Sequence, residues 1–122
     1  MSELNKIALK ILSNGKGILA ADESNGTMTK RLESVNIKSS PENRLIFRET
    51  LFTSGSMKDC IGGVILYDET INQRSNDEKT IPAKISETGA VPGIKVDTGA
   101  KDLANSLDEK VTEGLDGLRE RL

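Results

Sequence analysis

Acidic and hydroxyl side chains follow an apolar run near the start of this 122-residue chain. Residues 17–21 are apolar after Gly17, and Asp22, Glu23 and Ser24 come directly after them. Such a run is typical of a parallel-sheet strand that is buried on both faces. In open α/β sheets and barrels, active sites lie at the carboxyl ends of these strands. We therefore expect Asp22 and its polar neighbours to belong to a functional site.

A lysine in another apolar run is a candidate partner for Asp22. Lys95 lies in the run 91–97, which we expect to be a strand that also ends in an aspartate, Asp97. An inward-facing lysine in a buried strand is costly unless a carboxylate pairs with it, and either aspartate could be that partner. The pair could be a stabilising ion pair without chemistry. Buried strands rarely need one, so we favour a functional site.

Two basic residues, Lys30 and Arg31, follow the first polar cluster. Asn25-Gly26 predicts a turn and Thr27 a helix cap, which would put both cations in the first turn of a helix. Cations oppose the helix dipole at that position, and a phosphate bound at the helix N-terminus would remove the conflict. The alternative is that both residues are solvated surface charges.

Other side chains that carry chemistry are few. The chain has no histidine and one cysteine, Cys60, so a Cys–His or Ser–His pair and an ordinary zinc site cannot be built. We expect Cys60 to be a small buried packing residue. Arg44 and Arg48 lie one turn apart on a predicted helix, and we expect ordinary solvent-facing charges.

The overall charge excludes some classes of partner. Seventeen basic and 19 acidic residues give a net charge of −2, which offers no electrostatic reason for nucleic acid or an anionic membrane. No run approaches the roughly 18 apolar residues of a membrane span, and the start of the chain lacks the layout of a signal peptide. We therefore expect a cytoplasmic protein.

The predicted elements alternate between strands and helices. We expect strands over 17–21, 62–67 and 91–97, and helices over 4–12, from Thr27, from Ser40 to about Ser54, over 82–88 and from Leu115 onward. Residues 101–113 are expected to form a long loop. The second strand ends in Asp68, Glu69 and Thr70, which repeats the order of side chains after the first strand. This alternation predicts an α/β fold of parallel strands with right-handed crossovers.

Several segments, in this order along the chain, resemble class I fructose-bisphosphate aldolase. They are residues 15–26 (GKGILAADESNG), 30–32 (KRL), 42–44 (ENR), 61–66 (IGGVIL) with Glu69-Thr70, 93–97 (GIKVD) and 114–118 (GLDGL). The resemblance spans nearly the whole chain but only about the opening third of the family's (β/α)8 TIM barrel. It implies that residues 1–122 form the first three strands and their helices of that single barrel domain, truncated.

The resemblance also implies an activity. The family is a Schiff-base lyase that cleaves fructose 1,6-bisphosphate into dihydroxyacetone phosphate and glyceraldehyde 3-phosphate without metal or cofactor, as a homotetramer. Asp22 would be a catalytic carboxylate and Lys95 a catalytic cation. The substrate-binding residues would be Ser24, Thr27, Lys30, Arg31 and, more weakly, Arg44. The family's Schiff-base lysine matches no residue here, so we expect the chain alone to be inactive.

Two other functions fit parts of the sequence. A non-catalytic sugar-phosphate-binding or interaction module could have kept the anion site at Lys30 and Arg31 and lost the remainder. A doubly wound nucleotide-binding domain fits less well, because Gly15-Lys16-Gly17 precedes the first strand. The dinucleotide fingerprint requires its glycines after that strand.

Overall fold

A parallel sheet lies at the centre of the chain, which a computed structural model describes over residues 1–122. Its strands, in spatial order, are β1 (Gly17–Ala21), β2 (Ile61–Leu66) and β3 (Val91–Ile94). Ala21 pairs with Leu66, and Leu66 pairs with Ile94, so the three carboxyl ends are level. The predicted parallel strands are therefore confirmed, although the third ends at Ile94 and not at Asp97.

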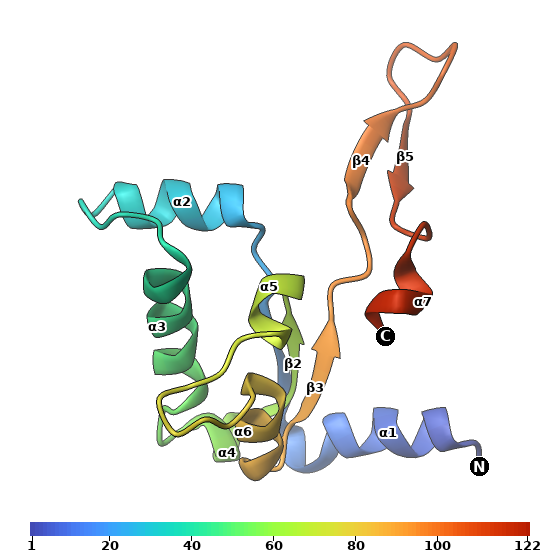
Figure 1. Cartoon of the computed structure of the whole chain (residues 1–122). Helices are drawn as coiled ribbons and strands as arrows, with labels where there is room; N and C mark the ends of the chain where they lie inside the picture. Colours follow the sequence, from blue (N-terminus) through green and yellow to red (C-terminus); the bar gives the residue numbers. More distant parts are fainter.

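Seven α-helices surround or extend from this sheet (Figure 1). They are α1 (Glu3–Ile11), α2 (Asn25–Glu33), α3 (Pro41–Phe52), α4 (Met57–Cys60), α5 (Asp68–Ile71), α6 (Ile81–Glu87) and α7 (Leu118–Arg121). The start of α3 is as predicted, because Ser40 Oγ accepts the N–H of Asn43 and Pro41 occupies the first turn. No helix is both long and apolar enough to cross a membrane.

The C-terminal quarter of the chain differs from the prediction. In place of a long loop over 101–113, β4 (Gly99–Asp102) and β5 (Lys110–Glu113) form an antiparallel hairpin, which projects from the sheet in Figure 1. The last helix is also shorter than its leucine spacing suggested. Helix α7 begins at Leu118, and Leu115 lies before it with 86% of its surface exposed.

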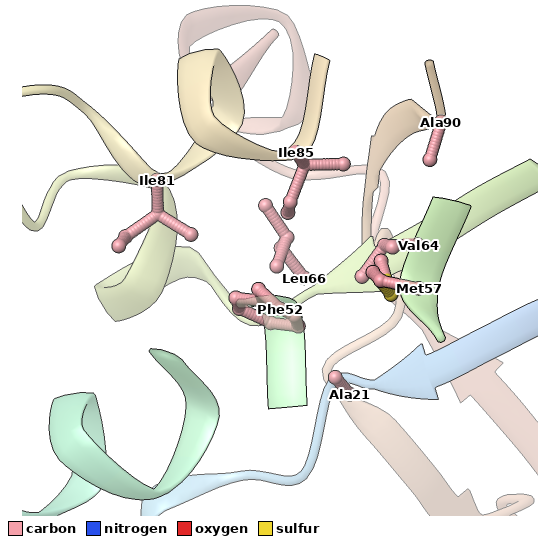
Figure 2. Packing of buried hydrophobic residues seen from close by; sticks show 8 residues of the cluster. All are labelled: Ala21, Phe52, Met57, Val64, Leu66, Ile81, Ile85 and Ala90. Atoms are coloured by element: carbon pink, nitrogen blue, oxygen red, sulfur yellow. The ribbon is translucent and has the colours of Figure 1, made fainter. Parts of the chain in front are cut away.

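The core lies between the sheet and the helices α3, α4 and α6. Its side chains, shown in Figure 2, are Ala21, Phe52, Met57, Val64, Leu66, Ile81, Ile85 and Ala90. Val64 and Leu66 are two residues apart in β2 and therefore point to the same face. The prediction that β1 is buried on both faces is wrong, because Ile18 is 54% exposed.

Two further predictions about burial are wrong. Cys60 ends the short helix α4 and is exposed, so it is not a packing residue. The face of α3 that turns inward carries Arg44 and Arg48 beside Phe52, all three of which are buried, whereas Ile46 is exposed. These three residues are spaced by four and therefore share one side of the helix.

Helix α1 touches the sheet through the end of the helix. A Cβ atom added to Gly62 would lie 1.7 Å from the carbonyl oxygen of Ile11, whereas one added to Gly63 would lie 3.1 Å from the Ile11 side chain. A Cβ added to Gly17 in β1 would meet nothing within 4 Å. Gly62 is therefore the position where the main chain of α1 approaches β2 most closely.

We expect Gly62→Ala to lower the free energy of unfolding by about 2 kcal/mol, because the added methyl group overlaps main-chain atoms that can only move with α1. Gly63→Ala should cost less, since a side chain can turn away. Gly17→Ala is the matched control and should change stability by no more than about 0.5 kcal/mol. Urea unfolding measures all three variants, and equal values for Gly62→Ala and Gly17→Ala would contradict the close approach.

Candidate functional site

Three charged side chains meet at the carboxyl edge of the sheet. Asp22 directly follows β1, and Lys95 directly follows β3. Lys95 Nζ lies 3.4 Å from Asp22 Oδ2 and 2.6 Å from Asp97 Oδ1. The predicted pairing is confirmed, with both aspartates as partners. One detail differs, because Lys95 lies one residue past the strand and its side chain is 26% exposed, so it is not an inward residue of a buried strand.

The two carboxylates hold Lys95 in its charged form. The hydrogen bond to Asp97 raises the pKa of Lys95, and the negative charge of Asp22 adds to the effect, against the opposing effect of burial. The same hydrogen bond lowers the pKa of Asp97. Lys95 is therefore a cation at neutral pH. It can donate hydrogen bonds and stabilise negative charge, but it is unsuited to attack a carbonyl, which requires a neutral amine.

A cavity of about 620 Å³ opens beside this group. Its lining residues are Ser24, Tyr67, Asp68, Lys95, Asp97, Thr98, Gly99, Asp116, Gly117 and Arg121. Arg121 reaches back from α7 and donates a hydrogen bond of 3.0 Å to the carbonyl of Val96. The cavity therefore has two cations in its wall, and of the predicted site residues only Ser24 and Lys95 line it. No group of three or more His, Cys, Asp or Glu side chains is arranged to hold a metal ion.

The cap of α2 is Ser24, whereas the sequence suggested Thr27. Ser24 Oγ accepts the N–H of Thr27 at 3.4 Å, and the helix begins at Asn25. Because the helix starts earlier than predicted, Lys30 and Arg31 lie in its last turn and not in its first. Cations are favourable there, so the conflict with the helix dipole that suggested an anion site is absent.

A network of charged side chains links the segments that follow β1 and β2. We call it the charged cluster, and its members are Glu23, Arg31, Arg44, Arg48 and Glu69. Arg44 binds Glu69 with two hydrogen bonds of 2.8 and 2.6 Å, and Arg31 pairs with Glu23. Arg48 is 0% exposed and lies between the two glutamates, 4.0 Å from the Glu23 carboxylate and 3.9 Å from that of Glu69.

This cluster is not predicted by the sequence, in which the spacing of Arg44 and Arg48 indicates charges that face solvent. The structure corrects this prediction: both are buried, and the Glu69 hydrogen bond raises the pKa of Arg44. The same bond lowers the pKa of Glu69, whereas burial lowers the pKa of Arg48. The one sequence signal for their burial was that Arg44, Arg48 and the apolar Phe52 are spaced by four residues and so share one side of the helix. The repeated Asp-Glu-hydroxyl order now has a structural basis, since Glu23 and Glu69 flank the same arginine.

Known proteins similar to this chain are fructose-bisphosphate aldolases. The family model described as "Fructose-bisphosphate aldolase class-I" matches residues 3–122. Fructose-bisphosphate aldolase B of Sparus aurata is 49% identical over 120 residues, which is 98% of this chain and 33% of that protein. A probable fructose-bisphosphate aldolase class 1 of Xylella fastidiosa is 48% identical over 122 residues, which is 100% of this chain and 36% of that protein.

A solved structure supports the same comparison. Fructose-bisphosphate aldolase from Plasmodium falciparum, in a complex with TRAP and a small molecule inhibitor, matches with a TM-score of 0.90 at 39% identity. The match covers 98% of this chain and 34% of that one. This chain therefore spans about a third of the length of the proteins that it matches.

Proposed function

The chain belongs to the class-I fructose-bisphosphate aldolase family, and we propose that it supplies part of the sugar-phosphate site of such a lyase. The observation that carries the proposal is the group formed by Asp22, Lys95 and Asp97 at the carboxyl edge of a parallel sheet. The proposed reaction of the whole enzyme is cleavage of fructose 1,6-bisphosphate into dihydroxyacetone phosphate and glyceraldehyde 3-phosphate by way of a Schiff base.

Asp22 and Lys95 are the proposed catalytic residues. Breaking a carbon–carbon bond next to a hydroxyl group requires a base that takes the hydroxyl proton and a cation that stabilises the developing charge. We propose the first role for Asp22 and the second for Lys95. The raised pKa of Lys95 makes it unsuitable as the Schiff-base amine. No other residue of the chain matches the Schiff-base lysine of the family, so we propose that this amine is not among residues 1–122 and that the chain alone does not cleave the substrate.

The proposed phosphate contacts receive unequal support. Ser24 lines the cavity, and Thr27 lies one turn further along α2. Lys30 forms no ion pair, so its ammonium group is available to a phosphate, whereas Arg31 is 54% exposed and paired with Glu23. Arg44 is the weakest of these candidates, because Glu69 occupies its guanidinium group.

We also propose that residues 1–122 belong to one domain, in which β1, β2 and β3 are the first strands of a (β/α)8 barrel. The parallel order of the strands and the similarity to the Plasmodium falciparum aldolase support this. A homotetrameric assembly of the full-length enzyme is a proposal that comes from the family resemblance, and a cytoplasmic location is a proposal that comes from the amino-acid sequence. A sugar-phosphate-binding module is the second candidate function, because Lys95 and Arg121 line the cavity, together with three aspartates, and could contact a phosphate group.

Two measurements test the proposed function. The purified chain should release no triose phosphate from fructose 1,6-bisphosphate, whereas a hybrid in which residues 3–122 replace the matching third of Sparus aurata aldolase B should cleave it. Turnover by the chain alone would contradict the proposal that the Schiff-base amine is not among residues 1–122. A folded hybrid without activity, together with sugar-phosphate binding by the chain, would favour the binding module.

A further inference from the structure

We propose that Arg48 is a positioning residue, whose guanidinium group joins the segment after β1 to the segment after β2 and thereby holds Asp22 against Lys95. Its importance for catalysis rests on the proposed function. The coupling between Arg48, Asp22 and Lys95 can be measured without substrate.

The hydrogen bonds of Arg48 are directed at the two strand ends. From α3, Nη1 donates to Thr70 Oγ1 at 2.8 Å, and Nη2 donates to the main-chain carbonyl of Glu23. The Tyr67 ring lies 5.8 Å from the guanidinium carbon. Thr70 and Arg48 are both 0% exposed, so the bond between them is shielded from bulk water.

The direction of the guanidinium group distinguishes Arg48 from an ordinary ion-pair arginine. An arginine that serves mainly as a counter-ion points both N–H groups of its fork at one carboxylate, as Arg44 does with Glu69. Arg48 lies about 4 Å from two carboxylates and directs its N–H groups at a hydroxyl and a main-chain carbonyl instead. It therefore fixes the course of the main chain in addition to balancing charge.

The bonded carbonyl is well placed to influence Asp22. It belongs to the residue directly after Asp22, so its hydrogen bond limits how far the Asp22 carboxylate can move. The contact from Asp22 to Lys95 is 3.4 Å, near the limit of a hydrogen bond, and a small displacement would break it. The 2.6 Å contact from Lys95 to Asp97 joins residues two apart and does not depend on Arg48.

The test is the pKa of the Lys95 amine, followed by carbon-13 NMR of labelled lysine, with Lys95→Gln to assign the signal. Asp22→Asn should lower this pKa, because it removes one of the two carboxylates. Arg48→Met should also lower the pKa of Lys95. Arg48→Lys, which keeps the positive charge but not the two-pronged guanidinium group, should lower it as well. The double variant Arg48→Met/Asp22→Asn should show no shift beyond that of Asp22→Asn.

The sign of the shift separates positioning from simple electrostatics. Removing a nearby cation would by itself raise the pKa of Lys95, whereas loss of the Asp22 contact lowers it. An upward shift or no shift in Arg48→Met, or an unchanged Lys95 in Arg48→Lys, would overturn the proposal. So would a shift in the double variant that is the sum of the two single shifts.

A control and a second variant cover loss of stability. Lys84→Met breaks the 2.9 Å pair with Glu49 between α6 and α3, and should lower stability without moving the Lys95 titration. If Arg48→Met does not fold, Thr70→Val tests the proposal in its place. This variant removes the hydroxyl that anchors the Arg48 guanidinium group at the end of β2, and it keeps the Arg48 charge. It should shift the pKa of Lys95 downward, and no shift would overturn the proposal. An inactive hybrid aldolase with the expected shifts would reject the proposed function alone.

Discussion

In the hybrid aldolase, Asp22→Asn is expected to lower kcat by about 100-fold or more, because removing a general base commonly has an effect of this size. The amide keeps the shape of the side chain, but it cannot take a proton and carries no charge to hold Lys95 at 3.4 Å. Since the loss concerns the chemical step more than binding, kcat should fall and KM should change little. Steady-state release of triose phosphates measures both constants.

Two matched variants make this expectation specific. Asp59→Asn changes an exposed aspartate on the short helix α4 and should leave kcat unchanged. Asp97→Asn removes the negative charge from the shorter contact to Lys95 but leaves Asp22 in place, so its effect on kcat should be smaller than that of Asp22→Asn. A kcat for Asp22→Asn within a few-fold of the unsubstituted hybrid would remove Asp22 from the proposed chemistry.

The strand ends were predictable from the sequence because the signal there is local. Each strand is a short apolar run followed by polar residues, and parallel strands bring their carboxyl ends to one edge of the sheet. The ends of the first and third strands therefore predict that Asp22 lies near Lys95. The resemblance to a known family gave the same residues a chemical role, which the geometry alone does not.

The start of α2 could not be decided in this way. Ser24 and Thr27 are both good cap residues, and they are three positions apart, so either one could begin the helix. The choice moved Lys30 and Arg31 from the first turn to the last turn. A sequence argument that depends on the position of a charge along a helix therefore needs the cap to be known first.

The burial of Arg48 is a long-range property. Its partners, Glu23 and Thr70, lie 25 and 22 residues away along the chain and come from different strand ends. Charged residues one turn apart on a helix usually face solvent. The only sign that Arg48 is buried was its position on the same side of α3 as the core residue Phe52. The hairpin β4–β5 was missed for a related reason, because its residues lack the apolar alternation of a half-buried strand.

The second large effect concerns stability. We expect Arg48→Met to lower the free energy of unfolding by about 3 kcal/mol, since it leaves the buried hydroxyl of Thr70 and the carbonyl of Glu23 without their donor. Two factors limit the loss. First, Glu69 retains its ion pair with Arg44 and Glu23 retains its ion pair with Arg31, so neither carboxylate is left unpaired. Second, the variant no longer pays the cost of burying a guanidinium group.

Urea unfolding of Arg48→Met, Thr70→Val and the double variant tests this explanation. If the main loss is an unsatisfied hydroxyl, removing that hydroxyl as well should recover part of the stability, so the double variant should be no less stable than Arg48→Met. Strictly additive losses would mean that Arg48 and Thr70 act independently and would contradict the 2.8 Å bond as the source of the effect. Because the same bond joins α3 to the end of β2, its removal should also lower the unfolding midpoint of the whole sheet and not of α3 alone.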